Sequence, residues 1–265
     1  MTYVLTLKKN EEKRLLEGHP WVYANEVAKI EGKDVQGSIA KVYSSDGRYI
    51  GSGYINHASK IIVRLLTRSD EVIDRDFFKK KIESAWKKRQ KLGFSESCRV
   101  VFGEADGLPA LIVDKYGDYL SVQFLALGME KRKEMIVDIL VEIFSPKGIY
   151  ERSDVKVREK EGLPLVKGFL YGNFDPVVEI TENGIRIRVD LENGQKTGYF
   201  LDQKENRLNI RRYIGENSEV LDCFCHTGGF SLNAAKAGAK EVVSCDISET
   251  ALSKVRENAA LNSFT

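Results

Sequence analysis

Hydrophobic and polar positions change their period several times along the chain, and each change marks a predicted element. In residues 1–72, short alternating stretches lie between clusters of Gly, Asn, Asp and Ser, a pattern that predicts strands. The expected strands cover residues 3–7, 38–43, 48–55 and 60–66, and a short helix is expected at 11–17. Asp46-Gly47 is a two-residue hairpin signal. We expect a compact β-barrel, either an RNA-binding module or a structural unit with Trp21 and Tyr23 in its core.

A helical period first appears in residues 75–92, where apolar side chains recur on one face. That face carries Phe78, Ile82, Ala85 and Trp86. The other positions are mostly basic, namely Lys79, Lys80, Lys81, Lys87, Lys88, Arg89 and Lys91. This basic face is either solvated surface or a phosphate contact, and in the second case Lys80, Lys87 and Lys88 bind RNA.

Residues 73–175 are expected to form a separate α/β domain. Strands are predicted at 99–103, 110–114 and 119–124, and a helix at 130–144. The polar cluster Glu151-Arg-Ser-Asp154 is expected at the end of a further strand. It is interpreted either as a turn with local ion pairs or as a site where Arg152 faces the substrate.

The third region, residues 176–265, opens with alternating strands at 177–181 and 185–191 around the hairpin signal Asn183-Gly184. A dense polar segment follows at 193–207, and Asp202 is expected to cap a helix that runs to about residue 213. The polar segment is either part of a functional site or an ordinary connection from a hairpin to a helix.

Residues 218–246 predict a strand, a glycine turn, a helix and a second strand that ends on a carboxylate. The first strand ends at Asp222, Gly228 and Gly229 allow a sharp turn, and Gly238 is placed to end the helix. Ligands bind at the carboxyl ends of strands in an open parallel sheet, and Asp246 at such an end suits a ribose diol.

The type of cofactor is indicated by the composition of this turn. It lacks the G-x-G-x-x-G pattern of dinucleotide sites, and its first residue is Asp222. A carboxylate repels a pyrophosphate but accepts hydrogen bonds from a cationic amino acid. The pattern therefore favours S-adenosylmethionine over NAD, although a glycine turn without any ligand is also common.

Charge, apolar content and cysteine content limit the possible partners and location of the protein. The formal net charge is +2, so any affinity for nucleic acid must come from local patches. No apolar run is long enough to span a membrane, and the N-terminus lacks a signal peptide. The four cysteines predict no disulfide framework and no metal site, and we expect buried thiols in a reducing cytosol. The expected location is cytoplasmic.

Several motifs together resemble a known family. They are His19-Pro-Trp-Val-Tyr23, Gly103-Glu-Ala-Asp-Gly-Leu-Pro109, Glu151-Arg-Ser-Asp154, the segment from Gly194 to Arg207 and Leu221-Asp-Cys-Phe-Cys-His-Thr-Gly-Gly-Phe230. In this order they resemble the bacterial 23S ribosomal RNA (cytosine-C5)-methyltransferases, class I enzymes that depend on S-adenosylmethionine. The resemblance covers the whole chain and implies ribosomal RNA as the partner.

The resemblance implies an α/β multidomain fold with an N-terminal PUA-like β-barrel, a central α/β domain and the start of a Rossmann-like methyltransferase sheet. It implies that the cofactor site comprises Lys196, Thr197, Tyr199, Phe200, Asp202, Arg207, Asp222, Phe224, Thr227, Gly228, Gly229, Phe230 and Asp246. In this family a cysteine thiolate adds to C6 of the base so that C5 can accept the methyl group.

The resemblance also implies that the family's catalytic cysteine and Asp-Pro-Pro motif lie beyond Thr265. We therefore expect a chain that is inactive alone, with an exposed edge and face on its last sheet and a tendency to form homodimers. Two alternatives remain open: an RNA-binding fragment without catalysis, and a methyltransferase that acts on a different base.

Overall fold

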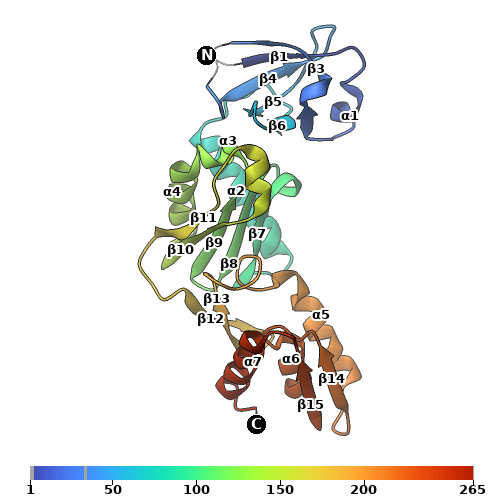
Figure 1. Cartoon of the computed structure of the whole chain (residues 1–265), viewed down its shortest axis with the longest axis vertical. Helices are drawn as coiled ribbons and strands as arrows, with labels where there is room; N and C mark the ends of the chain where they lie inside the picture. The colour runs from blue at the N-terminus through green and yellow to red at the C-terminus, as the bar shows by residue number, and fades with distance from the viewer. Residues whose placement is uncertain (1–2, 33–34, 265) are drawn as a thin grey trace.

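The computed structural model describes residues 3–32 and 35–264 of the chain. Three parts follow one another along the long axis of the molecule, and the two termini lie at opposite ends (Figure 1). They are a curled sheet near the N-terminus, a central sheet flanked by helices, and a C-terminal part that ends in a parallel strand pair.

The N-terminal sheet has six strands in the order β2-β6-β5-β4-β1-β3. Their bounds are β1 Tyr3–Leu7, β2 Trp21–Tyr23, β3 Val27–Glu31, β4 Ile39–Tyr43, β5 Tyr49–Ile55 and β6 Ile61–Thr67, with α1 at Lys13–Leu16 and η1 at Ala24–Glu26. The alternating residues of β1 point into the core, as its pattern predicts. β2 and β3 were not predicted, and Trp21 and Tyr23 lie half-buried outside the core.

The central sheet has five strands in the order β11-β10-β9-β8-β7, and only the β9–β10 pair is parallel. Its elements are α2 Arg75–Lys91, β7 Ser97–Phe102, η2 Gly103–Asp106, β8 Leu111–Tyr116, β9 Tyr119–Phe124, α3 Leu127–Glu130, α4 Lys133–Phe144, β10 Gly148–Ser153, η3 Lys156–Glu161 and β11 Val166–Tyr171. The predicted apolar face of α2 is confirmed, since Phe78, Ile82 and Ala85 are buried and Trp86 packs on Phe144.

The polar cluster Glu151-Arg-Ser-Asp154 lies at a strand end, as predicted, because β10 contains Glu151 and Arg152 and ends at Ser153. Both lie inside β10 and are buried. Glu151 accepts a hydrogen bond from Lys133 of α4, and Arg152 donates to the carbonyl oxygens of Leu191 and Gly194 at 2.9 Å each. Lys133 supplies the counter-charge of Glu151 from another element, whereas Arg152 pairs with the nearby Asp154 at 3.1 Å, so a polar sequence continues a buried strand.

The C-terminal part begins with the predicted hairpin. β12 (Val177–Glu182) and β13 (Ile185–Asp190) are joined by Asn183 and Gly184, whose φ angles of 55° and 73° suit a two-residue primed turn. The later elements are η4 Leu201–Gln203, α5 Lys204–Asn209, η5 Ile210–Tyr213, β14 Glu219–Cys223, α6 Gly229–Lys236, β15 Glu241–Cys245 and α7 Glu249–Leu261.

β14 and β15 form a two-stranded parallel sheet, as predicted. α6 packs on one face of this pair. On the other face Leu221 is 63% and Val243 46% exposed, which agrees with the expectation of a bare sheet face. Whether this face mediates a homodimer stays a prediction.

The three parts share buried contacts. Glu161 of η3 accepts hydrogen bonds from Asn56, Ser59 and Arg64 of the N-terminal part, all of them buried. Tyr116 and Tyr150 of the central sheet belong to the core that covers the β12–β13 hairpin. The parts on either side of the predicted domain boundaries at residues 72 and 175 therefore share buried contacts, and these boundaries stay a prediction. No helix in the described ranges meets the length and apolarity that a membrane span requires.

Candidate functional site

The turn between β14 and α6 has an unusual backbone. Phe224 and His226 have φ angles of 63° and 52°, and Gly228 has one of 85°. Left-handed conformations are uncommon for residues other than glycine and need support from their surroundings. That support comes from the amide of Cys225, which donates to the carbonyl oxygen of Cys245 at 3.0 Å. The turn is thus fixed to the end of the neighbouring strand.

Asp246 connects this turn to the N-terminus of α7. One carboxylate oxygen accepts a hydrogen bond from the amide of Ser248 and the other from the amide of His226, at 2.9 Å each. These two backbone hydrogen bonds lower the pKa of Asp246 below its usual value of 3.8. The carboxylate is therefore ionised at neutral pH and held in position at the carboxyl end of β15.

A pocket of about 590 Å³ lies between this turn, Asp246 and the segment after β13, and its volume is typical of a small-molecule site. It is lined by Arg188, Asp190, Asn193, Gly194, Gln195, Gly198, Phe200, Phe224, His226, Thr227, Asp246, Ser248, Thr250, Ala251 and Lys254. Four of the predicted cofactor residues meet here: Phe200, Phe224, Thr227 and Asp246.

His226 is a pocket residue that the sequence analysis did not single out. Its ring packs edge-on against Phe200 with centroids 5.1 Å apart. Burial lowers the pKa of His226 below its usual 6.5, against the raising effect of Asp246, so the ring is neutral at neutral pH. The only sequence signal for this residue was its place between the polar and glycine positions of the turn.

α7 holds the pocket together from the opposite side. The side chain of Asn258 is fully buried and donates to the carbonyl oxygen of Thr227 at 3.2 Å. Its oxygen accepts from the amide of Arg188 on β13 at 2.9 Å. One amide side chain therefore connects the turn to the hairpin edge.

Asp222 has a different environment from the one predicted. One of its carboxylate oxygens accepts hydrogen bonds from the amide and the hydroxyl of Ser231 in the first turn of α6, at 3.0 and 2.6 Å. Asp222 and Phe230 line a shallow cavity beside β14 and not the pocket that holds Asp246. These hydrogen bonds fasten α6 to its strand, and cofactor binding by Asp222 stays a prediction.

Thr197, Tyr199 and Arg207 are buried beneath the pocket wall. Arg207 donates two hydrogen bonds to Glu182, at 2.6 and 2.8 Å, and a third to the carbonyl oxygen of Phe200. The hydroxyl of Tyr116 lies 3.0 Å from that of Thr197. These side chains shape the wall from behind, because their polar groups are turned toward the protein interior.

Gly228 and Gly229 are required by close packing. A side chain at Gly229 would meet the Cδ of Arg207 at 2.7 Å and the hydroxyl of Tyr199 at 2.8 Å. At Gly228 it would meet Val255 at 3.1 Å. The glycines thus bring the turn against its neighbours, a requirement that the ligand-based interpretation of the turn did not anticipate.

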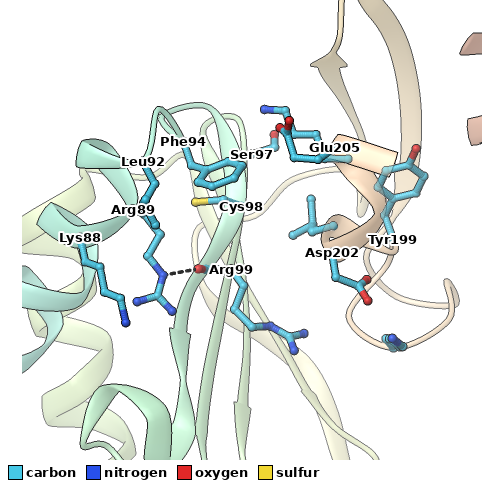
Figure 2. Close-up of a pocket in the computed structure, with 13 residues that line it drawn as sticks. Lys88, Arg89, Leu92, Phe94, Ser97, Cys98, Arg99, Tyr199, Asp202 and Glu205 are labelled. Atoms are coloured by element: carbon cyan, nitrogen blue, oxygen red, sulfur yellow. Dashed lines mark hydrogen bonds between the residues drawn. The ribbon is translucent and has the colours of Figure 1, made fainter. Parts of the chain in front are cut away.

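Lys196, Tyr199 and Asp202 line a second cavity, which shares no lining residue with the cofactor pocket; Figure 2 shows Tyr199 and Asp202 at its wall. The predicted capping role of Asp202 is wrong, because α5 has Gln203 at its N-cap and no side-chain capping bond. Asp202 is exposed within η4 instead.

The predicted RNA residues fall into two groups. Lys80, Lys87 and Lys88 are exposed on α2, with no ion pair to them among the described residues. Neighbouring cations are neutralised, since Lys79 pairs with Glu142 and Arg89 with Asp106. Arg152 is buried and bound to backbone carbonyls, an arrangement that favours a structural role over RNA contact.

The four cysteines are free thiols, but only Cys98 and Cys225 are buried, so the expectation of four buried thiols is wrong for Cys223 and Cys245. Burial raises the pKa of both buried thiols to about 11. A thiol with so high a pKa is a poor nucleophile at neutral pH.

The fold and the pocket define a class of protein. A parallel strand pair joined by a glycine turn and a helix, with an ionised carboxylate beside a pocket at the strand ends, is the nucleoside-cofactor half of a class I methyltransferase. The family model of S-adenosylmethionine-dependent methyltransferases matches residues 166–265, and that of PUA-like domains matches residues 5–68.

Relatives of the whole chain are named "Ribosomal RNA large subunit methyltransferase I". The protein from Shewanella amazonensis is 44% identical over 99% of this chain, and that from Vibrio cholerae is 42% identical over 100%. The alignment covers 67% of each relative. The chain therefore belongs to the ribosomal RNA large subunit methyltransferase I family, and its cofactor is S-adenosylmethionine.

Solved structures agree with this fold. A putative S-adenosylmethionine-dependent methyltransferase from Streptococcus mutans superimposes with a TM-score of 0.80 at 22% identity, covering 100% of this chain and 68% of that protein. A second putative methyltransferase, solved in complex with S-adenosylhomocysteine, gives a TM-score of 0.82 at 22% identity with the same coverage. The predicted multidomain α/β fold is confirmed.

Proposed function

We propose that the protein methylates C5 of a cytosine in large-subunit ribosomal RNA, with S-adenosylmethionine held in the pocket beside Asp246. The observation that carries this proposal is the locked carboxylate of Asp246 at the wall of a ligand-sized pocket, in a chain whose relatives are named for large-subunit ribosomal RNA. The assignment of C5 rests on the family resemblance of the sequence motifs.

The pocket residues fit the cofactor. Asp246 is placed to accept hydrogen bonds from a ribose diol, and the ring of Phe224, which is 89% exposed, offers an apolar surface beside it. Phe200 and Thr227 close the pocket on either side. S-adenosylmethionine, when bound, supplies an electrophilic methyl group, and these residues orient it and exclude water.

The remaining predicted cofactor residues are proposed to act through their neighbours. Thr197, Tyr199 and Arg207 support the wall that carries Phe200, and Gly228 and Gly229 permit the close packing of the turn. Asp222 and Phe230 position α6, while Lys196 and Asp202 face the second cavity. In this proposal none of these nine touches the cofactor's ribose.

The RNA substrate is proposed to lie along the PUA-like sheet and α2. Lys80, Lys87 and Lys88 supply uncompensated positive charge for phosphates, whereas the buried Arg152 does not. Methyl transfer to C5 requires a thiolate that first adds to C6 of the base, so that C5 becomes nucleophilic. Neither Cys98 nor Cys225 is assigned this role, because their raised pKa values keep them protonated.

Mass spectrometry of large-subunit ribosomal RNA from a strain that lacks the gene tests the proposal. We expect one 5-methylcytosine to disappear and to return when the gene is restored. Loss of a methyl group from a different base would contradict the C5 assignment. Unchanged methylation of the large-subunit RNA would contradict the proposed substrate.

A further inference from the structure

The second cavity lies between the central sheet and the segment that walls the cofactor pocket. Its volume is about 290 Å³, and it opens between the C-terminal end of α2, the start of β7 and residues 196–205. Figure 2 shows side chains of both parts facing each other across it. The cavity is lined by Lys88, Arg89, Leu92, Phe94, Ser97, Cys98, Arg99, Lys196, Tyr199, Leu201, Asp202, Lys204 and Glu205.

The cavity combines an apolar floor with a charged rim. Phe94, half-buried, and the buried thiol of Cys98 lie side by side on the central-sheet side (Figure 2), and Leu201 also lines the cavity. Leu92 at the entrance is 65% exposed. A flat, partly apolar group such as a nucleobase has a matching surface here, because unstacked bases bind on aromatic rings.

Among the cations of the rim, two arginines are paired and, within the part of the chain that the structure describes, three lysines are not. Arg89 and Arg99 are held by Asp106 and Asp114, which lie outside the cavity. Lys88, Lys196 and Lys204 have no ion pair among the described residues; Lys196 and Lys204 lie over the rings of Phe200 and Phe94, 4.6 and 5.6 Å from their centroids. The acidic rim residues are Asp202 and Glu205.

Two connections relate the cavity to the rest of the substrate path. Lys88 belongs both to its rim and to the exposed basic face of α2, with Lys80 and Lys87. The 194–201 segment separates it from the cofactor pocket, since Gly194, Gln195, Gly198 and Phe200 line the pocket while Lys196, Tyr199 and Leu201 line the cavity.

We propose that this cavity binds one unstacked nucleotide of the RNA strand next to the methylated base. Its base lies against Phe94, and its phosphates contact Lys88 and Lys204. The inference rests on the proposed function for the identity of the substrate, and it adds a separate subsite that sets which sequence is accepted. A strand that follows the lysines of α2 reaches this cavity before it reaches the cofactor.

Binding of a fluorescent single-stranded RNA to the full chain tests the proposal, with each base removed in turn. In the unmodified protein we expect one abasic position to weaken binding about tenfold, as loss of one stacked base does. The same abasic change is expected to have no further effect in the Phe94→Leu variant. If no position shows this coupling to Phe94, the inference is wrong.

A second variant keeps the test independent of the core contacts of Phe94. Lys88→Gln together with Lys204→Gln removes two rim charges and leaves the Phe94 side chain in place, and we expect weaker binding with a smaller dependence on salt. The control is Lys160→Gln, an exposed lysine of η3 that does not line the cavity. Equal binding by the double variant and the control would contradict the proposal.

The outcomes separate this inference from the proposed function. RNA binding that depends on Lys80 and Lys87 but not on Phe94 or Lys204 overturns the cavity and leaves the function intact. If the deletion strain loses the 5-methylcytosine but no abasic position is coupled to Phe94, the cavity is likewise overturned and the function remains. No RNA binding by the unmodified chain contradicts both.

Discussion

At the scale of single residues, the same kind of side chain has different roles according to its burial. Glu182 and Glu179 lie on the same strand, β12, and each forms two hydrogen bonds with an arginine. The Glu182–Arg207 pair is almost fully buried, whereas both side chains of the Glu179–Arg186 pair are at least 40% exposed. A buried charge that loses its partner is costly, while an exposed pair contributes little.

We therefore expect Glu182→Gln to lower the free energy of unfolding by about 3 kcal/mol, because it leaves the guanidinium of Arg207 buried without a counter-charge. The matched variant Glu179→Gln should change it by less than about 1 kcal/mol. Urea unfolding followed by circular dichroism measures both. Equal effects of the two substitutions would show that Arg207 is not held as the structure has it.

Asp246 is the residue on which the cofactor assignment depends most. Asp246→Asn keeps the shape of the side chain but removes its charge, so we expect S-adenosylhomocysteine to bind roughly tenfold more weakly or worse. The control is Glu241→Gln, an exposed residue at the start of β15, the strand that Asp246 follows. Calorimetric titration gives both dissociation constants, and an unchanged value for the Asn variant would remove Asp246 from the ribose site.

Among the elements, local patterns predicted most strands and helices, but not β2, β3 and β11. The period of α2, the Asn183-Gly184 hairpin and the order strand, turn, helix and strand at residues 218–246 were all readable from nearby residues. The interior position of Glu151 in β10 was not, because its partner Lys133 lies on another element. The hydrogen bond from Ser231 to Asp222 could not be predicted either, because it forms only once the turn is folded.

The packing of α6 against the segment before it gives an element-scale prediction. Gly229→Ala places a methyl group 2.7 Å from Arg207 and 2.8 Å from Tyr199, so we expect a loss of about 1–3 kcal/mol from overpacking. Gly215→Ala, where no atom lies within 4 Å, is the matched control and should change stability by less than about 0.5 kcal/mol. Thermal unfolding of the two variants compares them, and a stable Gly229→Ala protein would argue against this close approach.

In the whole molecule, hydrogen bonds join the N-terminal part to the central part. Tyr54 of β5 donates to the carbonyl oxygen of Pro109 at 2.8 Å, and Trp21 of β2 donates to Glu104 at the same distance. Together with the buried Glu161 cluster, these bonds tie the PUA-like sheet to the unit that carries α2. In the proposed function, RNA bound to one part is thereby positioned on the other.

This arrangement predicts how RNA binding depends on salt. If Lys80, Lys87 and Lys88 each contact one phosphate of a duplex region, changing all three to Gln should flatten the log–log salt slope by about 2.7. The control is the triple change of Lys156, Lys160 and Lys236 to Gln, three exposed lysines away from α2. Fluorescence anisotropy at several salt concentrations measures the slopes, and identical slopes would mean that the basic face of α2 is only solvated surface.

In the proposed function, S-adenosylmethionine binds between the turn after β14, Asp246 and the segment after β13. Hydrogen exchange followed by mass spectrometry, with and without S-adenosylhomocysteine, tests this location most directly. We expect slower exchange in residues 194–200, 224–228 and 246–248, and no such change with NAD. Protection confined to residues 88–99, or stronger protection by NAD than by S-adenosylhomocysteine, would show that S-adenosylmethionine does not bind at this site.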